Sequence, residues 1–267
     1  MSQNIKELKL AVVPKFHSVF FDQSKAGCID AAAQIKGVEC LYRGPDISNV
    51  RMQDQVINQL IDEGVDGIAI AVTQSNYLVK NSLKRAKEAG IPIITYDSDV
   101  DTSTNEDSSH LRLAYIGTDN FELGKILGEE LKKIRPNGGT LIMQSGRPDS
   151  PNLNLRLMGV RSALSGKKYA TPPGELLNND LGWTEVREPF FNFDQLDQSV
   201  KQMESVMKRS LLMSGSSSLL YNSGVFSTSS MIFDMVLITS IGYFPTEVSP
   251  DSMTASVPSS TALATSF

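Results

Sequence analysis

Short apolar runs alternate with longer amphipathic segments through the first 209 residues of the chain, and this alternation restricts its fold more than any other feature. Residues 67–72 are almost wholly apolar, which is typical of a strand covered on both faces of a parallel sheet. Residues 52–63, by contrast, repeat apolar side chains at helical spacing and are followed by Gly64. The alternation predicts an α/β protein in which helices join parallel strands.

The same pattern runs twice along the chain, because the alternation restarts at Gly139. We therefore expect an N-terminal α/β lobe over residues 5–120 and a C-terminal α/β lobe over residues 121–209, each built on a doubly wound parallel sheet. The predicted strands are residues 8–14, 38–42, 67–72, 91–96, 113–116 and 140–144, and the predicted helices are residues 21–35, 52–63, 78–89, 121–134, 154–164 and 200–208.

The composition changes sharply after Arg209. Residues 210–267 contain no Lys or Arg, carry only Asp234, Glu247 and Asp251 as acids, and are rich in Ser and Thr. The charged outer helix faces of an α/β domain cannot be drawn from such a segment. It is either a polar, weakly structured tail or sequence foreign to the domain, such as the product of a reading-frame change. We favour the second interpretation, because disordered tails usually carry more charge, and we expect the second lobe to be incomplete.

Charge and motifs argue against several classes of function. The chain has 25 Lys and Arg against 30 Asp and Glu, so it lacks the basic surface that nucleic acid requires. Its two histidines, His17 and His110, have no partners at metal-ligand spacing, and no nucleophile elbow or phosphate-binding glycine loop is present. Asp97 and Asp99 could act as an acid–base pair, but two acids in one loop more often cap or solvate it. We expect no enzyme activity, no cofactor and no bound metal.

The cysteines and the apolar runs bear on the compartment of the chain. Cys28 and Cys40 are too few for a disulfide framework and lack zinc-site spacing, so we interpret them as packing residues, with a single bridge as the alternative. Residues 1–10 lack the charged and apolar regions of a secretory signal. The apolar run at residues 231–241 is too short and interrupted to span a membrane, so the sequence predicts a soluble protein.

Two loops that follow predicted strands carry side chains suited to a small polar ligand, and parallel sheets bind ligands at the carboxyl ends of their strands. Phe20 and Phe21 follow the first strand, where an aromatic ring can stack on a pyranose or pack the helix onto its sheet, and we expect one residue to do each. Asp97 follows the fourth strand and can accept from two neighbouring hydroxyls or cap a turn. Arg156, in the second lobe, offers a planar fork to a sugar or forms a surface salt bridge.

Taken in order, these segments resemble the type I periplasmic sugar-binding proteins of the ribose, galactose and glucose type over residues 8–209. The matching motifs are Val19-Phe20-Phe21, Gly44-Pro45, residues 64–70, residues 89–93, Asp97-Ser98-Asp99, residues 115–120, and the set Asn152, Arg156 and Gly159. The motifs at residues 97–99 and 115–120 look most like the glucose-binding branch. The resemblance implies the two-lobed type I periplasmic-binding-protein fold, with ligand contacts in a cleft between the lobes from Phe20, Phe21, Asp97, Ser98, Asn152, Arg156 and Phe193.

The resemblance also implies a function. It predicts a monomeric solute-binding protein that binds a monosaccharide, with a glucose-like aldose favoured, feeds an ABC-type importer or a chemoreceptor, and lies in the periplasm or otherwise outside the cytoplasm. The alternative is a sensor of the same fold coupled to a membrane kinase. The family's later elements, including a return of the chain to the first lobe, have no match after Arg209. We therefore expect an unpaired edge in the second sheet and weak sugar binding or none, while the first lobe keeps its secondary structure.

Overall fold

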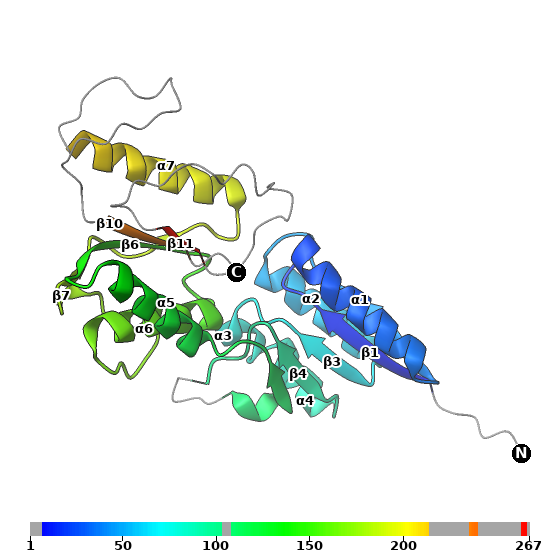
Figure 1. The fold of residues 1–267 in the computed structure, drawn as a ribbon. Helices are drawn as coiled ribbons and strands as arrows, with labels where there is room; N and C mark the ends of the chain where they lie inside the picture. The colour runs from blue at the N-terminus through cyan, green and yellow to red at the C-terminus, as the bar shows by residue number, and fades with distance from the viewer. Residues whose placement is uncertain (1–6, 103–107, 214–234, 240–262, 266–267) are drawn as a thin grey trace, which may run out of the picture. The chain divides into compact units, whose positions relative to one another are not determined.

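The computed structural model describes residues 7–102, 108–213, 235–239 and 263–265 (Figure 1). It separates the chain into two compact units. The first unit comprises Met1–Asp119 together with Asp149–Asn152, and the second comprises Asn120–Pro148 and Leu153–Phe267. Each unit contains one β-sheet and several helices, which confirms the predicted α/β fold class.

The first sheet has five parallel strands in the order β2-β1-β3-β4-β5. The strands are β1 Leu8–Val13, β2 Val38–Tyr42, β3 Gly67–Ile70, β4 Ile93–Tyr96 and β5 Ala114–Ile116, and each lies within a run that the sequence predicts as a strand. Because every pairing is parallel, the carboxyl ends of all five strands share one edge of the sheet. The loops at that edge carry the first unit's candidate ligand residues.

Helices cover the two faces of this sheet unequally. The helices are α1 Val19–Gln34, α2 Val50–Asp62, α3 Ser75–Leu78, α4 Ser82–Glu88 and the 3₁₀-helix η1 Ser109–Leu111. Ala11 and Val13 of β1 are buried in a core with residues of α2 and α4. Leu8 and Leu10 alternate with them and therefore point to the opposite face, which α1 covers, yet they are 40% and 39% exposed.

Two local contacts set helix boundaries that hydropathy alone misplaces. The Asn49 side chain accepts from the backbone N–H groups of Arg51 and Met52, so α2 begins at Val50. The helix predicted over residues 78–89 begins later in the structure, because α4 starts at Ser82 and the separate short helix α3 ends at Leu78. The Asp54 carboxylate accepts from the backbone N–H of Ser82 at 3.0 Å and so caps α4 where it begins.

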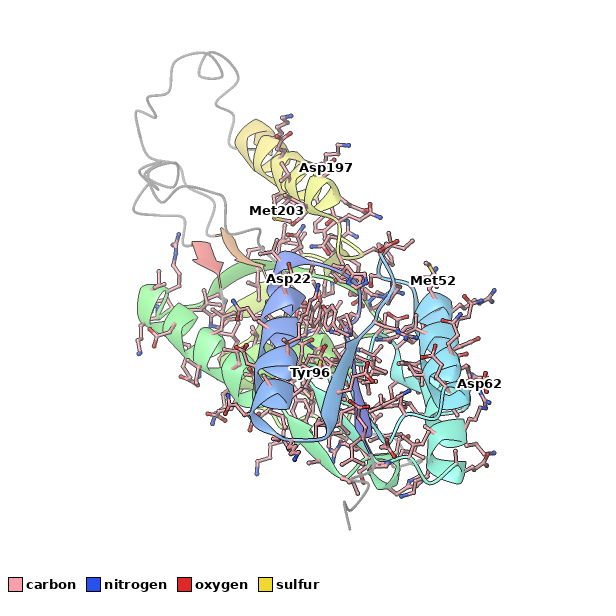
Figure 2. All side chains as sticks on the ribbon, turned by 90° about the vertical axis from the view of Figure 1, so that its right-hand side faces the viewer. Asp22, Met52, Asp62, Tyr96, Asp197 and Met203 are labelled. Carbon is pink, nitrogen blue, oxygen red and sulfur yellow. A yellow bond between two sulfur atoms is a disulfide. The ribbon has the colours of Figure 1, made fainter. Side chains whose placement is uncertain are left out.

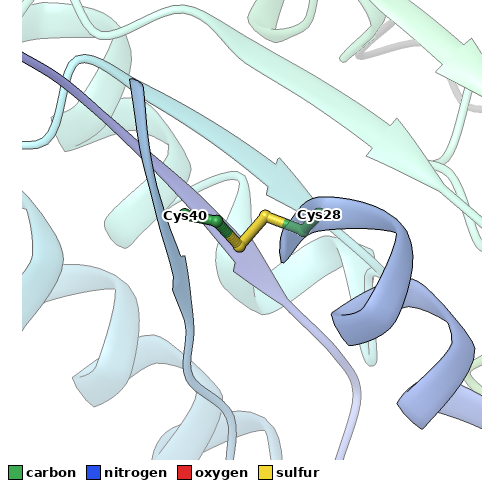
Figure 3. The surroundings of a disulfide bond; sticks show 2 residues. All are labelled: Cys28 and Cys40. Carbon is green, nitrogen blue, oxygen red and sulfur yellow. A yellow bond between two sulfur atoms is a disulfide. The ribbon is translucent and has the colours of Figure 1, made fainter. Parts of the chain in front are cut away.

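Cys28 and Cys40 form a disulfide that joins α1 to the edge strand β2 (Figure 3). The interpretation of the two residues as free packing cysteines is therefore wrong, and the alternative, a single bridge, is correct. Their Cα atoms are 5.8 Å apart, an ordinary spacing for a disulfide. Pairing depends on how the helix lies on the sheet, and the spacing of two cysteines in the sequence does not reveal it.

The second sheet is mixed rather than wholly parallel. Its strands are β6 Gly139–Ser145, β7 Asn178–Asp180, β8 Trp183–Glu185, β9 Phe190–Phe191, β10 Met235–Thr239 and β11 Leu263–Thr265, in the order β11-β10-β6-β8-β7 with β9 also beside β6. β7 runs antiparallel to β8. The two-residue turn between them has φ of 48° at Leu181 and 86° at Gly182, and positive φ at both positions is typical of a tight hairpin.

Helices pack on both faces of β6. They are α5 Asn120–Ile134, α6 Pro151–Ser165 and α7 Leu196–Met213. Leu141 and Met143 share a core with residues of α5 and α6, whereas Ile142 packs with Val206 of α7. The alternation along β6 therefore places helices on both sides of the strand, as a doubly wound unit requires.

The segment after Arg209 supplies backbone to the second sheet. α7 extends to Met213, β10 pairs in parallel with β6, and β11 pairs in parallel with β10. Two short strands of this segment therefore join the sheet where an unpaired edge was expected, while the second lobe is incomplete, as the sequence predicts. The other residues of 210–267, on which the interpretation as a foreign or weakly structured tail mainly depends, lie outside the described residues.

Candidate functional site

A charged pair lies at the carboxyl edge of the first sheet. Lys15 follows β1, Asp97 follows β4, and Lys15 Nζ lies 3.3 Å from Asp97 Oδ2. The two side chains are 14% and 20% exposed, so the pair is shielded from bulk water but reachable from it. An ammonium group has three donors and a carboxylate about four acceptor sites, so both partners keep capacity for a ligand. Together they can donate to one hydroxyl group and accept from its neighbour.

The backbone around Asp97 is held in a defined conformation. Asp97 has φ of 58°, a region that aspartate and asparagine adopt more readily than most residues. Its N–H donates to the carbonyl of Ile116 at 3.1 Å, and its carbonyl accepts from Tyr115 Oη at 3.0 Å. Both contacts are with residues of β5, and they hold the backbone of Asp97 at the edge of the sheet.

The two phenylalanines at the start of α1 have different surroundings. Phe21 is 3% exposed, and its ring lies 6.0 Å from that of Phe16 and 6.2 Å from that of Tyr96. The ring of Phe20 packs edge to face against that of Phe21, with 4.9 Å between the ring centroids, but Phe20 is 46% exposed. Phe21 therefore packs the helix onto the sheet, whereas Phe20 presents much of its ring to solvent.

Two tyrosines beneath α1 keep their phenol groups neutral. Burial raises the pKa of Tyr42 to about 12, and the nearby Asp22 carboxylate adds to the rise. Asp22 and Tyr96 are labelled in Figure 2. Burial also raises the pKa of Tyr96 well above its ordinary value. Tyr42 donates to the backbone carbonyl of Phe21 at 3.2 Å, so it helps hold the first turn of α1.

Ser98 and Asn152, both singled out from the sequence, lie together in the first unit. Ser98 Oγ donates to Asn152 Oδ1 at 3.1 Å, and Ser150 Oγ donates to the same oxygen at 2.7 Å. Both residues are buried, and the Ser98 carbonyl accepts from the N–H of Val72 at 3.0 Å. In this arrangement they support the loop that carries Asp97.

Two buried hydroxyl oxygens near the same edge, Ser18 Oγ and Thr73 Oγ1, have no hydrogen-bond partner among the described residues. Ser18 precedes α1 and Thr73 follows β3. Buried hydroxyl groups are nearly always bonded, so both are available to a polar ligand or to water.

The remaining predicted residues belong to the second unit. Arg156 on α6 donates from Nε to Asn120 Oδ1 at 2.8 Å. Phe193 lies beyond β9, is partly exposed, and has the guanidinium carbon of Arg147 5.8 Å from its ring centroid. Arg147 lies beyond β6, so Arg147 and Phe193 both belong to the carboxyl edge of the second sheet. Arg156 and Phe193 are predicted from the sequence, whereas Arg147 is not.

Lys15 is the main residue that the sequence argument missed. A signal for it existed, because Lys15 directly follows the proline that ends the first apolar run and so lies at the ligand edge. Asp99, in contrast, accepts from Arg112 Nε at 2.6 Å and Thr95 Oγ1 at 2.5 Å. Its carboxylate is occupied by these contacts, which leaves Asp97 as the acid available to a ligand.

In the described part of the chain, no three His, Cys, Asp or Glu side chains come together in a group that could hold a metal ion. None of the described helices is both long enough and apolar enough to cross a bilayer.

A family profile described as periplasmic binding protein domain matches residues 10–213. Among curated proteins, a xylose/arabinose-binding protein of Sulfolobus acidocaldarius is 26% identical over 152 residues, which is 55% of this chain and 37% of that protein. A fructose import binding protein of Bifidobacterium longum is 29% identical over 156 residues, 58% of this chain and 46% of that protein. The matched part thus spans less than half the length of these two relatives.

A solved structure shares both fold and sequence with the chain. It is an ABC transporter solute-binding protein of Burkholderia graminis in complex with D-arabinose, 26% identical, with a TM-score of 0.66 over 90% of this chain and 78% of that one. A solute-binding protein of Agrobacterium vitis bound to α-D-tagatopyranose, 22% identical with a TM-score of 0.64, has the same fold and covers 86% of this chain and 76% of its own.

Proposed function

The chain belongs to the periplasmic binding protein domain family, and from this premise we propose that it binds a monosaccharide and catalyses no reaction. The observation that carries the proposal is the Lys15–Asp97 pair beside the exposed ring of Phe20, at the carboxyl edge of the first sheet. The three relatives described above as xylose/arabinose-binding, fructose import binding and arabinose-bound are binding proteins by name.

The chemistry of the edge suits a sugar ring. Adjacent ring hydroxyls offer both donors and acceptors, and the Lys15 ammonium and the Asp97 carboxylate match this pair. The apolar C–H face of a pyranose stacks on an aromatic ring, a role for which Phe20 is exposed. Arg156 and Phe193 of the second unit are further proposed ligand contacts, with Ser98 and Asn152 supporting the Asp97 loop.

We propose an aldopyranose as the ligand class. The relatives are named for xylose and arabinose, which are aldopentoses, and for fructose, a ketose. Xylopyranose carries the same arrangement of ring hydroxyls as glucopyranose and lacks only its hydroxymethyl group. A site that reads adjacent hydroxyls would therefore accept a pentose or a glucose-like hexose, depending on the room beside C5.

The family implies an extracytoplasmic location, and we propose the periplasm, with an ABC-type permease as the partner of a monomeric binding protein. The Cys28–Cys40 disulfide supports this location, since disulfides form and persist in oxidising compartments.

Isothermal titration calorimetry of the full chain tests the proposal, with D-xylose, D-arabinose, D-glucose and D-fructose as ligands and a sugar-free buffer as control. We expect weak binding of at least one aldose, with a Kd on the order of 1 mM, because the sequence after Arg209 departs from the family pattern. Absence of binding to all four sugars would contradict it. Each mixture is then assayed for product, and any conversion of sugar would support an enzyme instead.

A further inference from the structure

The helix α1 is weakly held by its apolar contacts. Phe21 is the one residue of its 16 that is buried. Behind Phe21, the side chains turned toward the sheet recur every four residues as Ser24, Cys28 and Ala32, and all three are small and only half-buried. Small side chains bury little apolar area, so this stripe contributes little hydrophobic stabilisation.

The opposite face of the same sheet is packed differently. There α2 buries Gln53, Ile57 and Leu60. The hydrophobic core on this face also includes residues of α4. On the α1 face, Leu8 and Leu10 of β1 stay 40% and 39% exposed. α1 therefore lies on a face that it covers only in part, and it lacks the buried apolar contacts that hold α2.

Besides the contact of Lys25 with the ring of Tyr42, two attachments compensate for this, at different points along α1. The first turn is held by the packing of Phe21 among aromatic rings and by the hydrogen bond from Tyr42 Oη to the Phe21 carbonyl. The middle of the helix is held by the disulfide from Cys28 to Cys40, whose partner lies on the edge strand β2 (Figure 3).

We propose that the Cys28–Cys40 disulfide is a redox-sensitive clamp, which keeps the part of α1 after its first turn on the sheet under oxidising conditions and releases it in the presence of thiol reductants. In the releasing reaction a dithiol such as dithiothreitol breaks the S–S bond, the two cysteine sulfurs each gain a proton, and the dithiol is oxidised to its own cyclic disulfide. Phe20 and Phe21 lie before the released part, so the first turn stays in place.

Hydrogen exchange of the full chain with and without dithiothreitol tests the clamp. We expect reduction to speed exchange of the amides of residues 22–34 by about tenfold or more, while the amides of α2, residues 50–62, keep their protection. The double variant Cys28→Ser/Cys40→Ser should show the fast exchange without reductant and no further change with it. The variant Gln23→Ala, at an exposed position of α1, leaves the disulfide intact, is the matched control and should behave like the unmodified chain.

Three results would contradict the proposal that the disulfide is a clamp. One is a free thiol at Cys28 or Cys40 in the purified protein under non-reducing mass spectrometry. Another is unchanged exchange of residues 22–34 on reduction. The third is equal loss of protection in α1 and α2, which would show that the bond stabilises the whole unit instead of one helix. If the double variant does not fold, the proposal is tested by comparing hydrogen exchange of the unmodified chain in its oxidised and reduced forms.

Discussion

Asp97 occupies a backbone conformation that restricts which substitutions can test its role. Its φ of 58° lies in the left-handed region, where alanine is strained and asparagine is tolerated. Replacement by alanine would therefore mix loss of the carboxylate with strain in the loop. Asparagine keeps the shape and the backbone conformation and removes the charge.

We predict that Asp97→Asn weakens sugar binding by more than about 1.5 kcal/mol, roughly tenfold, because a buried sugar hydroxyl loses its charged acceptor. Calorimetry with the best-binding aldose measures the change. Asp30→Asn, at an exposed position on α1, is the matched control and should bind as the unmodified chain does. Equal affinity of Asp97→Asn and the control would remove Asp97 from the site.

The raised pKa of Tyr42 predicts how the stability of the first unit responds to alkaline pH. Its pKa is raised from 10.0 to about 12 by burial and by Asp22, so the folded state disfavours the phenolate. The resulting stabilisation is complete below the unfolded pKa and is lost as the pH rises through the folded pKa. The free energy of unfolding should therefore fall across this window.

Urea unfolding followed by circular dichroism at several alkaline pH values measures this effect. At neutral pH, Tyr42→Phe should cost about 1 kcal/mol, since it removes the hydrogen bond to the Phe21 carbonyl. Between pH 10.0 and about 12 its stability should fall less steeply than that of the unmodified chain, so the two curves converge. Parallel curves over this range would show that Tyr42 does not titrate as described.

At the scale of elements, α5 and α6 approach so closely that their backbones touch at two glycines. A Cβ atom on Gly124 would lie 2.0 Å from the carbonyl oxygen of Arg156, and one on Gly159 would lie 2.1 Å from that of Phe121. The obstructing atoms are backbone atoms, which cannot move aside as a side chain can. Glycine at these positions therefore allows the crossing that places Arg156 next to Asn120.

Gly124→Ala should destabilise the second unit by about 1–3 kcal/mol, because the added methyl group forces the two helices apart. Gly27→Ala on α1 is the control, since a Cβ there meets nothing within 4 Å. This control should stabilise the chain by about 0.5–1 kcal/mol through helix propensity. Thermal unfolding of both variants measures these changes in stability. A Gly124→Ala variant as stable as the unmodified chain would show that the two helices do not cross so closely.

Much of the architecture could be predicted from periodicity. All strands of the first sheet lie in predicted apolar runs, because a strand buried on both faces leaves a strong apolar signal. The hairpin β7–β8 and the short β9 were missed, since two- and three-residue strands show no period. The break between α3 and α4 was also missed, because a contact from α2 creates it.

The site was only partly predictable for a similar reason. Asp97 could be placed at the edge because it directly follows a strand, whereas the partner that it meets, Lys15, comes from another strand. Which of Phe20 and Phe21 is exposed depends on how α1 turns on the sheet. Sequence order indicates which loops share an edge, but three-dimensional packing decides which side chains in those loops meet.

At the scale of the whole molecule, the chain consists of two α/β units, and its matched part spans less than half of the curated relatives described above. The first unit holds the Lys15–Asp97 pair and the exposed Phe20 within one sheet edge. This unit therefore carries the central claim, that a monosaccharide binds at the carboxyl edge of the first sheet.

Hydrogen exchange of the full chain with and without the best-binding aldose tests this claim most directly. We predict added protection in residues 14–21 and 95–99, which form the edge, and none in residues 57–62, the last turns of α2. D-Sorbitol, an open-chain polyol without a pyranose ring, serves as the control and should protect neither segment. Sugar-dependent protection that spares residues 14–21 and 95–99, or protection by the open-chain polyol equal to that by the aldose, would contradict the account.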